Sequence, residues 1–261
     1  MKQKVKVDHT FLKVSLYSLI IFCSTTIPAF SRDVKEMGKD SVVSKMDSMG
    51  KEGEVGEEIV HPFFTHMGMP DPVGSYSLRI PVTATQMEGN TKADFGFHFE
   101  TGLSKTIGLH IRNDRFLNDT HSEIMFQFVA IKSKDGMSGF CPIIEFEIPT
   151  KKGVSRINTL VGFSTAYVRP RFAINQIIHY GPREDMLEGS AAFVYKVRNG
   201  IFLVTEIFGE KMPDELASFN LLVGVKVTVN KFLTLGIGYR QPISTNKEFS
   251  SQYIFSPDVE W

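Results

Sequence analysis

The sequence predicts an all-β protein, an up-and-down antiparallel transmembrane β-barrel of about 12 strands. Three observations lead to this fold class. Beyond residue 74, apolar and polar side chains alternate along one segment after another, which is the period of a strand with two different faces. The segments have about the 9–11 residues that a tilted strand needs to cross a bilayer. Short connections also alternate with longer ones, as in barrels whose chain ends lie on one side of the membrane.

The composition is that of a folded chain that is neither disordered nor built from apolar helices. Of the 261 residues, 42% are hydrophobic and 22% are charged, and phenylalanine is abundant with 22 copies. Lysine plus arginine and aspartate plus glutamate each number 29, so the chain lacks the basic excess typical of nucleic-acid binding. We therefore expect no nucleic-acid partner.

The first residues have the pattern of a secretory signal peptide. Lysines precede an apolar run at residues 14–23, and the small residues Ala29 and Ser31 precede a cut predicted near Arg32. The run has about half of the ~20 residues that a spanning helix needs. Residues 1–31 are therefore predicted to be removed, and the mature barrel is expected in the outer membrane of a Gram-negative bacterium.

Three further segments follow the signal peptide. Residues 32–60 are charged, contain glycines and lack aromatic side chains, which predicts a flexible periplasmic tether. Residues 61–74 are rich in proline and glycine and are predicted to be a lead-in or a plug, and residues 75–261 form the predicted barrel. Cleavage would remove Cys23 and leave Cys141 alone, so no intrachain disulfide is expected.

The predicted strands follow the alternation and are separated by turn-forming residues. They span residues 75–85, 93–103, 106–115, 122–133, 140–149, 157–168, 171–180, 190–198, 201–209, 218–229, 232–240 and 250–261. Most connections after even-numbered strands have two residues. Asn199-Gly200 is the strongest hairpin signal among them and favours a type I′ turn, in which both positions have positive φ. The connection at 134–139 is longer than this rule allows.

The two faces of the strands are expected to have different surroundings. In lipid every backbone group needs a partner inside the protein, and a closed sheet gives its strands no free edge. Apolar side chains then face lipid, and polar side chains face the lumen. The lipid-facing candidates are Phe95, Phe97, Phe99, Ile107, Leu109 and Ile111. The lumen-facing candidates are Arg79, His98, Glu100, His110, Arg112, Glu145, Glu147, Lys196 and Lys226.

The interior admits two interpretations. The charged side chains could line a pore or binding cavity that selects solutes by sign and size, or they could fill and cross-link a small barrel. Eight strands leave room only for side chains, whereas sixteen or more surround a water channel, and about 12 strands lie between these cases. Both interpretations stay open at this point.

The C-terminus resembles the signal by which outer-membrane barrels are recognised for assembly. Phe255 and Trp261 lie on one face of the last predicted strand and are expected to be read by the barrel assembly machinery. Pro257 lies between them and cannot donate to the ladder, so the sequence allows a break in the strand there.

Four side chains before the first strand are weak candidates for a metal site. His61, His66, Met67 and Met69 offer imidazole and thioether ligands, which suit a soft metal such as copper(I). Their spacing matches no closed-site pattern, so we expect neither a metal nor another cofactor.

No enzymatic motif is found in the sequence. Ser164, Ser190 and His179 are available as nucleophile and base, but nothing places a base beside a nucleophile, and no G-x-S-x-G motif occurs. We therefore expect a protein that is not an enzyme.

Three stretches resemble a known family. They read "HPFFTHMGMPDPVGSYSLRI" (61–80), "FGFHFETGLSKTIGLHIR" (95–112) and "LLVGVKVTVNKFLTLGIGYRQPI" (221–243). They are similar to bacterial outer-membrane β-barrels grouped as transporters, a group that includes the phenol meta-pathway outer-membrane type. The resemblance implies an outer-membrane protein that passes small solutes, hydrophobic ones included.

The residues and the resemblance together lead us to expect a passive outer-membrane channel or transporter for small solutes. One alternative is a non-conducting structural or adhesion-type outer-membrane barrel. Another is a soluble periplasmic ligand-binding barrel, in which the two faces would be inverted. The expected partners are outer-membrane lipid, the barrel assembly machinery and a small-molecule solute.

Overall fold

The computed structural model describes residues 59–261, apart from residues 88, 118–120, 135–136 and 151–155. The predicted signal peptide, residues 1–31, lies outside the described residues. The predicted tether, residues 32–60, does so as well except for Ile59 and Val60.

Fifteen strands form one antiparallel sheet in the described part of the chain. Their bounds are β1 (Tyr76–Arg79), β2 (Val82–Met87), β3 (Asn90–Phe95), β4 (Phe97–Ser104), β5 (Ile107–Asn113), β6 (His121–Phe128), β7 (Ile131–Lys132), β8 (Gly139–Pro149), β9 (Asn158–Arg169), β10 (Phe172–Gly181), β11 (Met186–Arg198), β12 (Ile201–Lys211), β13 (Ser218–Asn230), β14 (Leu233–Pro242) and β15 (Ser251–Glu260).

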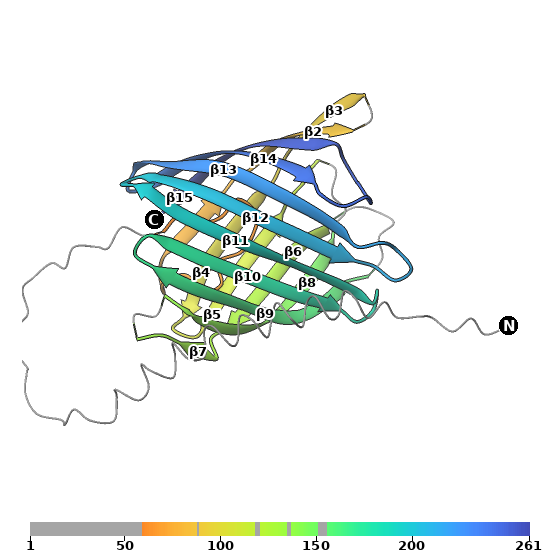
Figure 1. Cartoon of the computed structure of the whole chain (residues 1–261). Coiled ribbons are helices and arrows are strands. Elements are labelled where there is room, and N and C mark those ends of the chain that lie inside the picture. Colours follow the sequence, from red (N-terminus) through yellow and green to blue (C-terminus); the bar gives the residue numbers. More distant parts are fainter. Residues whose placement is uncertain (1–58, 88, 118–120, 135–136, 151–155) are drawn as a thin grey trace, which may run out of the picture. The chain divides into compact units, whose positions relative to one another are not determined.

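The sheet closes on itself because β1 pairs with both β4 and β15 (Figure 1). Two barrel strands are each broken into two pieces, β1 with β2 and β3 with β4, and β7 lies off the barrel path. The result is a closed barrel of 12 strands, which confirms the predicted fold class. No helix of the described residues is long and apolar enough to cross a membrane.

The first two barrel strands are broken where proline and glycine interrupt the ladder. Ile80–Pro81 separates β1 from β2, and Gly96 separates β3 from β4. A Cβ atom on Gly96 would lie 2.5 Å from the Asn113 carbonyl oxygen, so only glycine fits there. The Gly96 N–H donates to the Pro81 carbonyl over 2.8 Å and joins the two breaks. Beyond them β2 and β3 project from the barrel as a hairpin (Figure 1).

One predicted strand ends earlier than the alternation suggests. The sequence predicts a strand over residues 122–133, whereas β6 ends at Phe128 and β7 pairs separately with the start of β8. The Ser133 N–H donates to the Ser138 carbonyl over 2.8 Å. The connection that was too long for the two-residue rule is thus a small hairpin of its own.

The Asn199-Gly200 connection is a short turn but not a type I′ turn. Gly200 has a φ of 72°, whereas Asn199 is not among the described non-glycine residues with positive φ. A β-bulge between Lys196 and Arg198 changes the register just before the turn. The bulge, and not a second left-handed residue, therefore adapts the turn to the strands.

The last strand continues through Pro257, so the break that the sequence allowed does not occur. The Ile80 N–H donates to the Pro257 carbonyl over 3.0 Å, and the return bond is the one that proline cannot make. Ile80 lies where β1 gives way to β2. The proline therefore removes one ladder bond at a point where the neighbouring strand is already interrupted.

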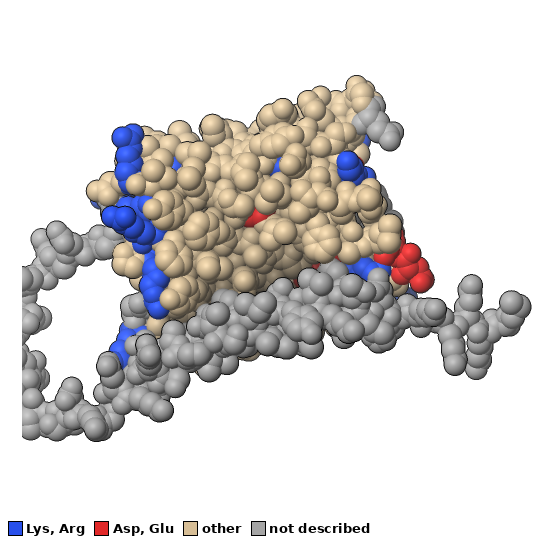
Figure 2. Space-filling model, viewed as in Figure 1, with Lys and Arg blue, Asp and Glu red and all other residues tan. Residues whose placement is uncertain are grey.

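The outer face of the barrel is apolar. In Figure 2 the visible wall is almost free of charged side chains between its ends, and basic side chains gather along one rim. Along β13, Val223 and Val227 are 47% and 40% exposed, whereas Lys226, on the opposite face, is completely buried. An apolar band between polar ends is typical of a sheet surrounded by hydrocarbon.

We call residues 59–74 the lumen segment: residues 59–71 are buried or half-buried inside the barrel, and residues 72–74 are exposed. They contact inward-facing side chains from β1, β4, β6, β9, β10, β12 and β13. A buried apolar cluster joins the segment to the wall through Ile59, Val60, Phe63, Phe64, Met69, Cys141, Ala166, Val168, Ala173, Val194, Phe202, Val204, Leu222 and Ile254. The interior therefore differs from the expectation of a uniformly polar lining, because the lumen segment brings its own apolar side chains.

Candidate functional site

The lumen segment is held at its centre by one carboxylate of the wall. Glu206 on β12 is completely buried and accepts the backbone N–H groups of Phe63, Phe64 and Thr65. The N–H groups of Phe64 and Thr65 lie 3.1 and 2.7 Å from Oε2. Three converging N–H groups bind a carboxylate through charge-assisted hydrogen bonds. This contact therefore holds the backbone of the lumen segment against β12 and gives the buried carboxylate its hydrogen-bond donors.

Two cations bind the carbonyl groups just before this point. Arg79 Nη1 and Lys226 Nζ both donate to the Pro62 carbonyl oxygen over 2.9 Å. Lys226 also pairs with Asp258 at 2.5 Å, and its ammonium lies 4.7 Å from the centre of the Phe63 ring. The lumen segment therefore satisfies a buried lysine and a buried arginine that the strands alone would leave short of partners.

The Phe63 ring lies in a slot made by glycines on the inner face of β13 and β14. A Cβ atom on Gly224 would lie 2.6 Å from the ring, and one on Gly236 would lie 2.7 Å from it. The two glycines lie opposite Gly238 and Lys226, respectively, across the strand pair. The absence of side chains at these positions makes the space that the ring fills.

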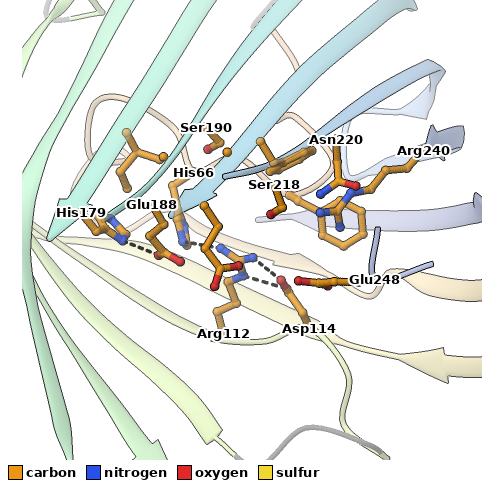
Figure 3. Close-up of a pocket in the computed structure, with 16 residues that line it drawn as sticks. His66, Arg112, Asp114, His179, Glu188, Ser190, Ser218, Asn220, Arg240 and Glu248 are labelled. Carbon is orange, nitrogen blue, oxygen red and sulfur yellow. Dashed lines mark hydrogen bonds and ion pairs between the residues drawn. The ribbon is translucent and has the colours of Figure 1, made fainter. Parts of the chain in front are cut away.

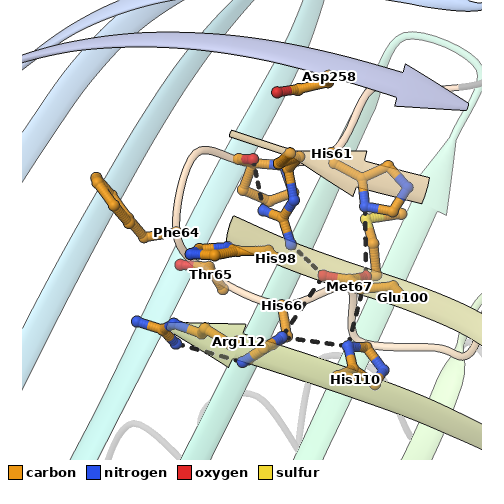
Figure 4. A network of polar contacts seen from close by, with 12 residues as sticks. His61, Phe64, Thr65, His66, Met67, His98, Glu100, His110, Arg112 and Asp258 are labelled. Atoms are coloured by element: carbon orange, nitrogen blue, oxygen red, sulfur yellow. Dashed lines mark hydrogen bonds and ion pairs between the residues drawn. The ribbon is translucent and has the colours of Figure 1, made fainter. Parts of the chain in front are cut away.

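A buried network of imidazoles surrounds Glu100 on β4. The carboxylate pairs with Arg79 and lies 3.4 Å from His61 Nδ1, 3.5 Å from His66 Nδ1 and 3.5 Å from His110 Nδ1. Glu100 is 1% exposed. Figure 4 shows His61 and His66 of the lumen segment converging with Glu100 of β4 and His110 of β5. The arginine compensates the charge of Glu100, which would otherwise be costly to bury.

The hydrogen-bond partners fix the protons of His66 and His110. Arg112 Nη1 lies 3.3 Å from His66 Nε2, and because arginine only donates, this nitrogen accepts. The proton of His66 is then on Nδ1, 3.2 Å from His110 Nδ1. Burial lowers the pKa of His66 well below its usual value, which agrees with a neutral ring. Gln127 Oε1 accepts from His110 Nε2, because the other atom of the amide, Nε2, donates to the Met67 carbonyl.

His61, at the other end of the network, has the opposite tendency. Burial disfavours its charged form, but Asp71 and Glu100 outweigh burial and raise the pKa of His61 to about 9. Its Nε2 lies 3.7 Å from Asp71 and 3.9 Å from Glu260. One imidazole of the lumen segment is therefore neutral and the other is charged at neutral pH.

A cavity of about 160 Å³ opens beside the lumen segment at the end of the barrel with the longer connections (Figure 3). It is lined by Phe64, His66, Arg112, Asp114, Ile177, His179, Glu188, Gly189, Ser190, Phe208, Gly209, Glu210, Ser218, Asn220, Arg240 and Glu248. Arg112 pairs with Asp114. The guanidinium of Arg240 lies 4.5 Å from the centre of the Phe208 ring and 5.3 Å from that of Phe249, and the described residues form no ion pair with it. We call this space the upper cavity.

A second cavity, of about 270 Å³, lies at the end with the short turns and the C-terminus. We call it the lower cavity, and it is lined by His61, Asp71, Pro72, Ser75, Tyr76, Ser77, Lys231, Phe232, Glu260 and Trp261. His66 lines the upper cavity and His61 lines the lower one. The lumen segment thus separates two polar spaces within one barrel.

The nine lumen-facing candidates differ in their burial. Seven of them take part in buried or half-buried contacts inside the barrel: Arg79, His98, Glu100, His110, Arg112, Glu145 and Lys226. Glu147 is half-buried and accepts a hydrogen bond from Asn158 over 2.8 Å. Lys196 is half-buried beside the β-bulge of β11.

The six lipid-facing candidates lie on the other face of β3, β4 and β5. Phe95 is 39% exposed. Phe97, Phe99, Ile107, Leu109 and Ile111 are half-buried. Aromatic neighbours cover part of this surface, since Tyr76 stacks on Phe99 and Phe116 stacks on Phe95. At the C-terminus Phe255 and Trp261 are 46% and 55% exposed.

The four weak metal candidates do not form one cluster. His61 and His66 lie in two different groups of imidazoles and carboxylates that share Glu100. The sulfur of Met69 accepts from the Cys141 thiol over 3.6 Å, and Met67 contributes its carbonyl to Gln127. The two histidines therefore share the Glu100 carboxylate, whereas the Met69 sulfur contacts Cys141.

The residues considered for an enzyme make contacts of different kinds. Ser164 is completely buried, and its hydroxyl accepts from Gln127 Nε2 over 2.6 Å. His179 Nδ1 contacts Glu188 at 2.9 Å and Glu145 at 3.5 Å. Ser190 lines the upper cavity together with His179.

Several important residues were not singled out from the sequence. Glu206, Gln127 and Glu188 each hold the lumen segment or line a cavity, and Asp258 pairs with Lys226. A signal exists only for Glu206, which interrupts an inward row of apolar residues at Phe202 and Val204. The partners of that carboxylate lie more than a hundred residues away, so alternation along the strand does not reveal them.

Solved structures share this fold, although no protein-family model and no curated protein matches the chain. A KdgM porin aligns with 9% identity and a TM-score of 0.54, over 70% of this chain and 98% of the porin. An outer-membrane channel from Pseudomonas putida F1 aligns with 9% identity and a TM-score of 0.53, over 74% and 98%. A KdgM porin in complex with disordered oligogalacturonate aligns with 10% identity and a TM-score of 0.51, over 72% and 98%. The likeness establishes a fold shared with outer-membrane porins and channels.

Proposed function

We propose that this protein is a passive channel of the bacterial outer membrane that passes small solutes. The observation that carries the proposal is the pairing of an apolar, almost uncharged outer wall (Figure 2) with an interior that holds two polar cavities, of which Figure 3 shows the upper one. A closed sheet with these two faces suits a lipid surround and an aqueous interior. The fold shared with porins and channels supports the proposal.

The upper cavity favours a small polar solute. Arg240 offers a guanidinium without an ion pair among the described residues, and Asp114 and Glu188 place carboxylates on the same cavity. Few precisely placed charged groups in a cavity fix the orientation of a ligand. This lining favours polar solutes over the hydrophobic ones that the family resemblance implies.

The finer parts of the proposal follow from the sequence. The signal-peptide pattern supports export in a Gram-negative bacterium, and the three quoted stretches support a relationship to the phenol meta-pathway outer-membrane type. Phe255 and Trp261 are exposed as the assembly machinery would require. Outer-membrane lipid, that machinery and a small solute remain the proposed partners, and we propose no enzymatic activity.

Conductance in planar bilayers tests the proposal. The wild-type protein should give small, discrete steps, because the lumen segment leaves narrow passages. The double variant Phe63→Ala/Glu206→Gln, which loosens the lumen segment, should give larger steps. Phe128→Ala, at an exposed position at the end of β6 that lines neither cavity, is the matched control and should conduct like the wild type.

A non-conducting structural barrel is the second candidate, and the buried apolar cluster around the lumen segment favours it. Silence of both the wild type and the double variant in the bilayer would support this second candidate and refute the channel. A soluble barrel is disfavoured because the exposed face is the apolar one. Phe97→Arg tests this point, since a charge placed in lipid should weaken folding into vesicles by about 2–4 kcal/mol.

A further inference from the structure

Four groups of imidazoles and carboxylates in the described residues bring three potential ligand atoms within 4.8 Å of one another. In three of them an arginine already engages a member. Glu100, which belongs to two groups, is paired with Arg79, and His66 Nε2 accepts from Arg112. A metal ion would have to compete with a guanidinium in each of these places. The fourth group consists of Glu145, His179 and Glu188, and the ion pairs of the described residues place no arginine or lysine on it.

The strand order explains how this fourth group forms. His179 on β10 is the direct cross-strand partner of Glu188 on β11, and Glu145 reaches toward them from β8 across β9. The residue of β9 that faces His179 is Gly162. A side chain at Gly162 would clash with the Ile178 backbone, so β9 leaves a gap between the two charged strands. The gap lets Glu145 and His179 meet.

The group has a buried side and an open side. Glu145 and His179 are 2% and 4% exposed, whereas the side chain of Glu188 is 36% exposed. His179 and Glu188 line the upper cavity, and Figure 3 shows them pointing toward each other at its edge. Glu145 and His179 are thus buried in the barrel wall, and Glu188 faces the upper cavity.

One oxygen of the group lacks a hydrogen bond. Glu145 Oε2 is buried and accepts no hydrogen bond from the described residues, and its neighbour, His179 Nδ1, is 3.5 Å away. The same nitrogen is 2.9 Å from Glu188 Oε1. One imidazole thus faces two carboxylates, and a buried carboxylate oxygen without a donor is costly. A cation between the three side chains would remove this cost.

The spacing suits a small divalent cation. Zinc binds imidazole nitrogen and carboxylate oxygen at about 2.0–2.2 Å, so tetrahedral ligand atoms lie about 3.3–3.6 Å apart. The separations of 2.9 and 3.5 Å are close to this range. Mixed nitrogen and oxygen ligands suit zinc and its first-row neighbours, whereas calcium and magnesium prefer oxygen alone.

We propose that Glu145, His179 and Glu188 bind one divalent cation of the zinc class in the wall of the upper cavity, with a fourth ligand position open to that cavity. The site requires the fold but not conduction, so it stands or falls separately from the channel proposal. A bound cation would neutralise the two carboxylates and change the charge that a solute meets in the upper cavity.

Zinc uptake by the folded full-length protein in detergent tests the site. Titration of Zn²⁺ against a chromophoric chelator should show one zinc ion per chain. Glu145→Gln should weaken binding by more than about tenfold, and Glu188→Gln, at the half-exposed ligand, should do the same. Replacement of zinc by Co²⁺ should give the visible absorption of a four-coordinate ion in the wild type and not in either variant.

Matched controls separate this site from the other groups. Glu147→Gln removes a carboxylate two residues along the same strand, outside the group, and should leave zinc binding within about twofold of the wild type. His110→Ala alters the group around Glu100 and should also leave zinc binding unchanged. Heat-dependent migration on gels shows whether each variant is folded. A folded wild type that takes up no zinc would overturn the proposal, and so would zinc lost in His110→Ala but kept in both glutamate variants.

Discussion

The lumen segment has two different neighbours inside one barrel. On one side, which we call the charged wall, it meets Arg79, Glu100 and His110 from β1, β4 and β5. On the other side, the glycine wall, the Phe63 ring fills the space above Gly224 and Gly236 of β13 and β14. The charged wall binds the segment through partners that each group needs, whereas the glycine wall accepts it through shape.

The difference shows that ion pairs, as well as hydrophobic burial, hold the lumen segment inside the barrel. A buried ion pair is sensitive to the loss of either partner but gains little over apolar packing of the same volume. A packed ring is sensitive to volume on both sides of the contact. The charged wall should therefore set the position of the lumen segment, and the glycine wall should set how tightly it fits.

Removal of the arginine from the charged wall should have the largest effect. Arg79→Met leaves Glu100 without its arginine in a place that is 1% exposed, so the free energy of unfolding should fall by about 3–5 kcal/mol. Urea unfolding in lipid vesicles measures it, with fluorescence of the single tryptophan, Trp261, as the signal. Arg171→Met, in an exposed turn, should change the free energy by less than about 0.5 kcal/mol. Equal unfolding of both variants would contradict the role given to the charged wall.

Loss of the ring from the glycine wall should have the next largest effect. Phe63→Ala removes a completely buried ring and should cost about 3 kcal/mol in the same unfolding experiment. It should also raise bilayer conductance, because the slot beside Gly224 and Gly236 becomes free. Phe63→Leu retains much of the apolar volume and should lie between wild type and Phe63→Ala in both measurements. A loss of stability without any change in conductance would mean that the ring is not in the path of solutes.

The same contrast separates what the sequence predicts from what it does not. Lipid requires an apolar side chain at every second position, so the outer face is a local property, visible at Val223 and Val227 without knowledge of any partner. The inner face depends on partners that are distant in sequence. Gly236 indicates only close packing, and Glu206 indicates only an inward carboxylate. Their partners, Phe63 and the N–H groups beside it, come from a segment more than 140 residues earlier.

The two cavities and the proposed cation site could not be predicted from the sequence either. Glu145 and His179 each show the alternation of an inward residue, but their meeting depends on Gly162 between them. The register of three strands decides that meeting, and alternation in one strand carries no register information. Alternation along the chain therefore predicted where most strands lie. It did not predict the interruption between β1 and β2, which lets the last strand continue through Pro257 without the break that the sequence allowed.

Added volume on the glycine wall should have a moderate effect that depends on Phe63. Gly236→Ala puts a methyl group 2.7 Å from the ring, so the free energy of unfolding should fall by about 2 kcal/mol. In the Phe63→Ala background the same change should cost much less, because the space is then empty. A double-mutant cycle measures this coupling. Additive effects of the two changes would show that Phe63 does not occupy the slot.

The smallest effect should come from Val223, which precedes Gly224 and lies on the outer face of the barrel. Val223→Leu adds a methylene group to a side chain that is 47% exposed, so unfolding and conductance should both stay within error, with less than about 0.5 kcal/mol of change. Gly224→Ala is the matched variant one position away, where a Cβ atom would lie 2.6 Å from the Phe63 ring. It should destabilise the protein as Gly236→Ala does. Similar costs for the two neighbours would mean that the inner and outer faces are not distinguished by packing, and the glycine wall would lose its explanation.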